Sequence, residues 1–534
     1  MNDKIISATR RELLQLLAGG GMGLALTALP GVSLAQGRKD VLVIGLDISD
    51  TITLDPARQA AYTVPLTLGA AYDSLVTMDP GNYTEVKPAL ATSWKRTADD
   101  KNWRFTLRKG VKFASGNPMT TEDVKWSFER LKALKDQPWL YLANIEAVNI
   151  IDATTIDVIL KDSAMPLLNL LASLTWVVYE RKVLEQQGGK AGADDKATTW
   201  LDGHSAGTGA YSLTAWTRNV QIQLTRNPHY WRRTPAFQRI IIRHIPDSAA
   251  QLLAIERGDI DVAFNLLPEQ AVKMKNDSNI RIEELPSLDF VYMAVTQNAE
   301  FNKALAIKEA RQAISYAIDY DGIKNGLLGG AAQRPASFLP IGVLGSTNEI
   351  ARKIGFKQDL DHAKELLKKA NLPDGFEFQL SYGNATIAGV SYQILAQKIQ
   401  SDLARVGIKA QLNPVDQVNL RTNYSTGKTT AVLTFWNAPS VANQLWAEAS
   451  VQRVARRVHW TPPKELIDLV RSATVETDKD KQTQLWIDFQ KQLVDQASLI
   501  VLFQPVYQIA VRQNIKSFPL TAAGWQAELR DAHP

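Results

Sequence analysis

One serine, Ser205, lies in a sequence pattern that could support covalent catalysis. Residues 203–207, GHSAG, fit the G-x-S-x-G turn that exposes a nucleophilic serine between a buried strand and a helix. The residues before this turn, 194–199, are polar, whereas residues 211–214 after it have the composition of a strand. Because this context does not suit a nucleophile, we expect a structural turn at Ser205. A secreted serine hydrolase that uses Ser205 stays open as an alternative.

Metal, thiol and phosphate chemistry have little support in the sequence. The chain has no cysteine, which excludes disulfides, thiol catalysis and cysteine-ligated metals. Its six histidines contain neither an H-E-x-x-H pattern nor a pair spaced by four residues. Residues 427–429, GKT, match the end of a phosphate-binding loop, but Thr422 stands where its first glycine is required. We therefore expect no cofactor.

The charge pattern identifies no macromolecular partner. Lys and Arg number 60 against 55 Asp and Glu, and this near balance does not indicate a nucleic-acid binder. The arginine-rich segment 453–457 is more typical of a solvated helix face than of a binding patch.

The elements that would position a site alternate between short apolar strands and amphipathic helices. Residues 102–108 alternate apolar and polar and predict a half-buried strand, and Thr120 with Asp123 predicts a capped helix start. A long helix is predicted over 306–328 and a buried strand over 499–503. This alternation predicts α/β domains. A chain of 534 residues is too long for a single hydrophobic core, and no linker is evident. We therefore expect the chain to pass between its domains more than once.

The first 35 residues have the pattern of an export signal. Arg10 and Arg11 precede an apolar, glycine-rich stretch over 16–29, and residues 33–35, SLA, predict cleavage between Ala35 and Gln36. The paired arginines indicate the twin-arginine route. The remaining sequence has no run of 18 uninterrupted apolar residues, so we expect a soluble mature protein.

Several ordered sequence blocks carry a family resemblance. Residues 88–131 contain PALATSW, WRFTLRKGVKF and TTEDVKWSFER. They are followed by GTGAY at 207–211, RNPHYW at 226–231, RGDID at 257–261 and RQAISYAID at 311–319. Together these blocks resemble the extracellular solute-binding proteins of family 5, the dipeptide- and oligopeptide-type receptors of ABC importers.

The resemblance implies a two-lobed type II periplasmic-binding-protein fold of the α/β class. Residues 36–284 would form lobe I, with an extra subdomain inserted at about 65–205. Residues 285–500 would form lobe II, and 501–534 would return to lobe I. The lobes would close over a small polar organic solute at a hinge. A peptide-holding chaperone on the same fold is a further alternative.

The same resemblance implies how such a receptor is used. It performs no chemistry, binds no nucleic acid, and is expected to be a monomer that delivers its ligand to an ABC permease in the inner membrane. Many such receptors are tethered through a lipidated cysteine, and this chain has none. We therefore expect a receptor that is not lipidated and is free in the periplasm.

The ligand-binding residues also follow from the resemblance. Peptide receptors of this family hold the ligand ammonium with an Asp shortly after a Trp, but here Trp436 is followed by NAPS. An unpaired ammonium in a closed site costs roughly 2–5 kcal/mol, which disfavours an ordinary peptide. A peptide-like solute, an opine or a sugar conjugate is expected instead. The candidate ligand-binding residues are Trp436, Asn437, Tyr382 and Asn384 from lobe II and Ser49, Asp50 and Thr51 from lobe I.

Overall fold

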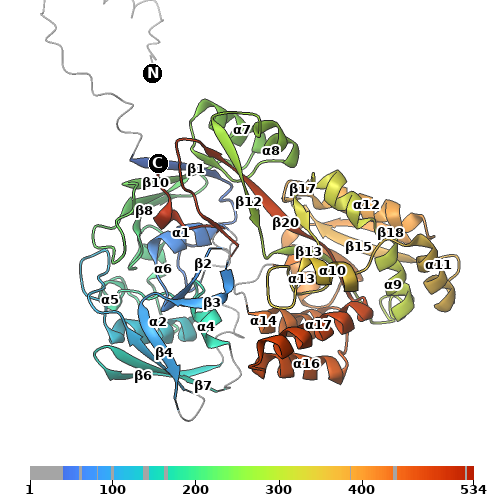
Figure 1. Cartoon of the computed structure of the whole chain (residues 1–534), viewed down its shortest axis with the longest axis horizontal. Helices are drawn as coiled ribbons and strands as arrows, with labels where there is room; N and C mark the ends of the chain where they lie inside the picture. Colours follow the sequence, from blue (N-terminus) through green and yellow to red (C-terminus); the bar gives the residue numbers. More distant parts are fainter. Residues whose placement is uncertain are drawn as a thin grey trace, which may run out of the picture. The chain divides into compact units, whose positions relative to one another are not determined.

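The short apolar segments become strands of one large mixed sheet (Figure 1). The computed structural model describes residues 40–58, 63–80, 82–97, 102–135, 144–161, 166–384, 386–436, 442–522 and 526–534. The predicted export signal, residues 1–35, lies outside this part of the chain, as does the candidate ligand residue Asn437. The main path through the sheet runs in the order β18 (Lys409–Val415), β15 (Glu377–Gly383), β19 (Ala431–Trp436), β13 (Phe290–Val295), β20 (Leu499–Arg512), β11 (Val262–Ala263), β1 (Val41–Leu46), β10 (Arg239–His244), β9 (Gln221–Arg226) and β8 (Tyr211–Thr217).

One long strand, β20, joins the two halves of this sheet. Residues 499–503 pair with β13, whereas residues 506–512 pair with β12 (Ile280–Pro286), and Ala510 and Val511 also pair with β11. Pro505, which cannot donate a backbone hydrogen bond, lies between these two stretches. In Figure 1 the strand runs between the half that contains β1 and the half that contains β13. The chain therefore passes from one half of the sheet to the other within β20.

Strand β13 shows how the second half builds a core on both faces of the sheet. Val291, Met293 and Val295 belong to one hydrophobic cluster with helices α9 (Lys308–Ala317), α11 (Leu360–Lys369) and α12 (Tyr392–Ala404). The alternate residues, Phe290, Tyr292 and Ala294, belong to another cluster with α14 (Asn443–Glu448), α16 (Lys464–Val475) and α17 (Lys479–Gln496). Successive side chains of a strand point to opposite faces, so helices cover both sides.

A separate antiparallel sheet lies within the first half. Its order is β4 (Ala91–Arg96), β5 (Asn102–Leu107), β7 (Thr155–Leu160) and β6 (Ile145–Asp152). Helix α2 (Thr121–Leu134) contacts β6 and begins with the predicted capping box, in which Asp123 N donates to Thr120 Oγ1 and Thr120 N donates to Asp123 Oδ2. The apolar stripe of the helix, formed by Val124, Phe128 and Leu131, is buried. The predicted helix start and the predicted buried face are both confirmed.

The GTG block has a packing explanation. A Cβ atom on Gly209 would lie 2.3 Å from the carbonyl carbon of Ala71, and one on Gly207 would lie 2.2 Å from the Ala71 carbonyl oxygen. Both glycines therefore allow the turn before β8 to touch the end of α1 (Val64–Ala71).

The predicted helix over 306–328 is wrong in its length. Helix α9 ends at Ala317, and Ile318 has extended backbone dihedrals of φ −71° and ψ 130°. A separate π-helical turn covers Gly322–Leu327. Asp319 explains the break, because its carboxylate accepts hydrogen bonds from Gly322 N and from Lys398 Nζ. These tertiary contacts outweigh the apolar periodicity that continues through the segment.

Candidate ligand-binding site

The loop between β1 and α1 starts where parallel strands end side by side. β1 pairs in parallel with both β10 and β11. The backbone amide of Asp47 donates to Asn265 Oδ1 at 2.8 Å, and that of Ile48 donates to His244 Nδ1 at 3.2 Å. His244 ends β10 and Asn265 follows β11, so the start of the loop is fixed to its neighbouring strands. In α/β folds, ligands commonly bind outside such carboxyl ends.

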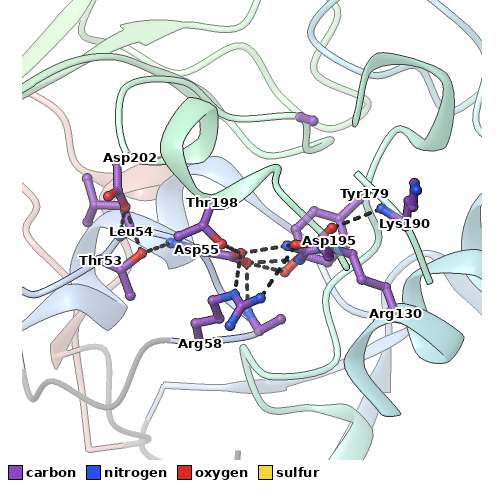
Figure 2. A network of polar contacts seen from close by, with 12 residues as sticks. Thr53, Leu54, Asp55, Arg58, Arg130, Tyr179, Lys190, Asp195, Thr198 and Asp202 are labelled. Carbon is purple, nitrogen blue, oxygen red and sulfur yellow. Dashed lines mark hydrogen bonds and ion pairs between the residues drawn. The ribbon is translucent and has the colours of Figure 1, made fainter. Parts of the chain in front are cut away.

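Asp55, farther along this loop, is held by a buried ion network (Figure 2). Arg130 of α2 donates to Asp55 Oδ1 at 3.0 Å and Oδ2 at 2.6 Å, and to Asp195 Oδ1 at 3.0 Å and Oδ2 at 2.8 Å. The side chains of all three residues are 0% exposed. Thr198 Oγ1 adds a hydrogen bond to Asp55 Oδ2 at 2.8 Å. The network thus joins three segments that are distant in sequence.

The electrostatic environment of the network favours the charged forms of Asp55 and Arg130. Burial pushes the pKa of Asp55 upward, but the hydrogen bonds and charge of Arg130 outweigh it and hold the pKa below its ordinary value. The pKa of Arg130 is raised, because Asp55, Tyr179 and Asp195 favour its charged form more than burial opposes it. The loop is therefore anchored at its start and again at Asp55.

The three lobe I candidates lie between these two anchored positions. Ser49 and Asp50 are exposed, and Thr51 is buried, with its amide donating to Ile48 O at 3.1 Å. Asp50 accepts a hydrogen bond from Thr63 N at 3.1 Å and another from the Thr63 hydroxyl. Ile52 beside them is 77% exposed. The structure thus brings these residues together on one loop and gives Asp50 a partner just before α1.

Trp436 ends β19 and borders a cavity of about 460 Å³. Its ring packs on Phe338 with centroids 5.2 Å apart and an interplanar angle of 62°. The guanidinium carbon of Arg453 lies 5.8 Å from the centre of the Trp436 ring. The other lining residues come from α14, the π-helical turn Ala449–Val454, the short helix Ala455–Arg457 and the following turn: Leu445, Glu448, Ala449, Val451, Gln452, Ala455, Arg456, Trp460, Thr461 and Pro462.

The other two lobe II candidates lie elsewhere. Tyr382 is 5% exposed and packs in the cluster that contains α9, α11 and α12, whereas Trp436 packs against the cluster on the opposite face of β13. Asn384 is exposed just after β15. Neither residue lines the cavity beside Trp436.

Sequence reasoning missed two arginines of this cavity. Segment 453–457 was expected to be a solvated face, but Arg453 and Arg456 both line the cavity wall. Their spacing of three residues is compatible with one side of a helix, but the sequence carries no signal that this side borders a cavity. Arg457, the next residue after Arg456, does not line the cavity, and its guanidinium carbon lies 4.9 Å from the centre of the Tyr424 ring.

Ser205 has the contacts of a turn residue. Its hydroxyl accepts a hydrogen bond from Leu213 N at 2.9 Å. The short helix α6 (Thr198–Leu201) precedes it and β8 follows, which is not the strand–serine–helix order of a nucleophile turn. The neighbouring His204 stacks on Trp200 with centroids 4.8 Å apart.

Comparison with known proteins supplies the family. The sequence profile described as "Bacterial extracellular solute-binding proteins, family 5 Middle" matches residues 85–450. The chain belongs to this family. Members of the family bind small molecules such as peptides and deliver them to ABC permeases. They are solute-binding proteins rather than enzymes.

Individual relatives extend this result to nearly the whole chain. "Probable D,D-dipeptide-binding periplasmic protein DdpA" of Escherichia coli (strain K12) is 30% identical over 519 residues, 95% of each chain. The structure of DppA from Helicobacter pylori in complex with peptide STSA matches with a TM-score of 0.74, 22% identity, and coverage of 92% of this chain and 99% of that one. AgaA from A. tumefaciens R10 in complex with agropinic acid matches with a TM-score of 0.73, 23% identity, and coverage of 92% and 98%.

These matches confirm the predicted type II periplasmic-binding-protein fold. The family-5 chain is therefore a substrate-binding protein of the ABC-importer type, related to periplasmic proteins. In the part of the family-5 chain that the structure describes, no helix has the length and apolar character needed to cross a membrane.

Proposed function

We propose that this chain is an exported receptor that captures a small polar organic solute beside Trp436 and performs no chemistry itself. The cavity of about 460 Å³ carries this proposal. Small-molecule sites have volumes of ~300–1,000 Å³ and combine apolar walls with a few polar groups. Trp436 and Trp460 supply flat apolar surface, and Arg453, Arg456 and Glu448 supply charge.

The solute is peptide-like, or an opine or sugar conjugate. The names of relatives support this range, since DdpA is named for D,D-dipeptides and AgaA binds agropinic acid. The residues after Trp436, NAPS, lack the Asp that would hold a peptide ammonium. Asn437, Tyr382 and Asn384 stay predicted contributors from lobe II, and Ser49, Asp50 and Thr51 from lobe I.

We also propose the division into lobes. Lobe I comprises residues 36–284 and 501–534, and lobe II comprises 285–500. The pairing of β20 supports this division, because its two stretches belong to different halves of the sheet. The extra subdomain at about 65–205 contains the separate four-stranded sheet and α2.

The receptor works as a monomer in the periplasm. We propose that it leaves the cytoplasm by the twin-arginine route, is cleaved between Ala35 and Gln36, and carries no lipid, because it has no cysteine. It binds no nucleic acid and passes its solute to an inner-membrane ABC permease. Deleting the cognate permease then abolishes uptake, whereas a chaperone role would leave the protein's effect intact.

Native mass spectrometry of Trp436→Ala tests the site. Protein purified from the periplasm is expected to carry a small molecule, and the variant is expected to lose it. Trp216→Ala is the matched control, because Trp216 lies on β8, outside the cavity, and contacts Arg218 at 4.3 Å from its ring centre. A solute at 100 times its dissociation constant adds ~2.7 kcal/mol of stability, which a thermal-shift screen detects. Equal solute occupancy in Trp436→Ala and wild type would rule out this cavity.

A further inference from the structure

The two proposed lobes touch at two short segments that do not belong to the main sheet. One is the hairpin of lobe II that pairs β16 (Thr386–Ile387) with β17 (Val390–Ser391), and the other is the start of α8 (Pro268–Met274) in lobe I. A Cβ atom on Gly389 would lie 2.6 Å from Pro268 Cδ. Figure 1 places β17 beside α8, where the two halves meet. The hairpin and α8 are therefore in close contact across the lobes.

Two glycines of lobe II make room for Pro268. Ala388 and Gly389 are the two turn residues of the hairpin, with φ of +49° and +79°, the positive values typical of a type I′ turn. A Cβ atom on Gly389 would also lie 3.4 Å from Leu267 Cα. One on Gly329 would lie 3.3 Å from Pro268 Cβ. Pro268 thus lies against two positions in lobe II whose lack of a side chain admits its ring.

Both segments are fixed to their own lobes. Val390 of the hairpin is buried in the hydrophobic cluster that contains α9, α11 and α12. Leu266 is buried in a different cluster, together with α7 (Ser248–Arg257). The next residue, Leu267, donates from its backbone amide to Gln270 Oε1 at 2.9 Å, which fixes the start of α8. Because each segment is anchored in its own core, the distance between them follows the position of the lobes.

The contact lies beside the segments that carry predicted ligand-binding residues. In lobe II, Tyr382 and Asn384 directly precede the hairpin in the chain. In lobe I, Asn265 lies three residues before Pro268, and its Oδ1 accepts a hydrogen bond from Asp47 N at 2.8 Å. Asp47 begins the loop that carries the three lobe I candidates. Closing the contact would therefore bring the predicted residues of the two lobes toward one another.

We propose that Pro268 and the β16–β17 hairpin form a closing contact between the lobes, and that Gly389 determines how completely the lobes shut over their solute. The inference rests on the proposed function, because it assigns residues that control closure of the same receptor. Pro268 and Gly389 are positioning residues, since they act on the solute through the lobes. A side chain at position 389 would hold the lobes apart, because the packed ring of Pro268 leaves no space for it.

Distances between spin labels test the contact directly. Since the chain has no cysteine, Leu253→Cys on α7 and Gln397→Cys on α12 would carry the only two labels. Both positions are exposed, and neither lines the cavity beside Trp436. In mature protein purified from the periplasm, Gly389→Ala is expected to shift the distribution of label distances to longer values than in the labelled parent.

Two further variants separate the contact from backbone strain. Gly110→Ala is the matched control, because Gly110 has a φ of +77° and nothing lies within 4 Å of an added Cβ. It carries similar strain without the contact, so its label distances are expected to equal those of the parent. Pro268→Ala removes Cδ, the atom that the methyl group at position 389 would meet. In the Pro268→Ala background, Gly389→Ala is therefore expected to change the label distances little.

Binding of a small molecule gives a second measurement. D-alanyl-D-alanine is the probe, because the proposed solute is peptide-like, and it is titrated by calorimetry. Gly389→Ala is expected to weaken binding at least about 10-fold, and Gly110→Ala less than about 3-fold. In the Pro268→Ala background, Gly389→Ala is expected to change the affinity less than about 3-fold. Urea unfolding is expected to show similar losses for Gly389→Ala and Gly110→Ala, since opening of the lobes relieves the clash and leaves only the strain of a positive φ.

The outcomes separate this inference from the receptor function. Label distances in Gly389→Ala equal to those of the parent would overturn the closing contact. The same holds if Gly110→Ala reproduces the shift, or if the shift persists in full in the Pro268→Ala background. Unchanged affinity of Gly389→Ala for a probe that binds the parent would overturn its role in holding the solute. If the protein carries no solute and binds no probe, but Gly389→Ala still lengthens the label distances, the receptor function fails and the contact stands.

Discussion

Replacing Arg130 with methionine tests how strongly the buried ion network holds the loop after β1. The change keeps much of the side-chain volume but removes the cation that donates to Asp55 and Asp195. Breaking a buried pair by removing one partner costs about 3–5 kcal/mol, because the remaining charge is left uncompensated. Arg58 stays nearby, but only at 3.9 Å from Asp55 and 3.7 Å from Asp195, so we expect a loss near the lower end, about 3 kcal/mol.

The loss should depend on pH in a defined direction. In the wild type the pKa of Asp55 lies below its unfolded value, so its contribution is present at neutral pH and disappears only as the pH falls through the folded pKa. Without Arg130, burial dominates and raises the pKa of Asp55 above the unfolded value of about 3.9. The variant then loses stability as the pH rises. The deficit relative to wild type is therefore largest near pH 7 and shrinks toward pH 4.

Urea unfolding at pH 7.5 and pH 5 measures this deficit. Arg104→Met is the matched control, because Arg104 makes a similar two-point contact with Asp157, at 2.8 Å and 2.8 Å, but its side chain is 39% exposed. We expect the control to lose less stability and to show little change in deficit between the two pH values. A loss for Arg130→Met no greater than that of the control, or one that grows toward pH 5, would refute the electrostatic reasoning.

Two further substitutions test how local structure is built. Gly209→Ala should lower the free energy of unfolding by about 1–3 kcal/mol in urea titration, since the new Cβ meets the Ala71 backbone at 2.3 Å; Gly326→Ala, with nothing within 4 Å of its Cβ, is the neutral control. Thr120→Ala should cost about 1 kcal/mol by removing the cap of α2, and Thr120→Ser should restore stability. An unchanged urea midpoint for Gly209→Ala or Thr120→Ala would contradict the corresponding assignment.

Features that depend on neighbours in sequence could be predicted well. Thr120 and Asp123 are three residues apart, and their reciprocal hydrogen bonds form at the start of α2 without help from distant residues. The strand predicted over 102–108 follows from an equally local alternation and forms as β5. Periodicity failed at Ile318, because the groups that end α9 include Lys398, about eighty residues away in the chain.

The candidate site could be predicted only in part, for the same reason. Trp436 was found because it stands in a family motif, and the structure places it beside a cavity. That Arg453 and Arg456 reach this cavity depends on how the helical segment after α14 turns, which no local pattern specifies. In the buried network, Arg130 lies 65 positions from Asp195 and 75 positions from Asp55 in the chain. No sequence pattern predicts contacts at these separations. Tyr382 lies near the end of β15 and packs in the hydrophobic cluster on the other face of the sheet.

The place of β20 in the chain has a consequence for the order of synthesis. Residues 499–512 pair with β11, β12 and β13, so both halves of the main sheet lack a strand until this segment has been synthesised. Pairing partners such as Ile280 and Arg512 are more than two hundred residues apart, and contacts of such separation form slowly. Neither half can complete its sheet before residues 499–512 have been synthesised, so the same strand completes both halves.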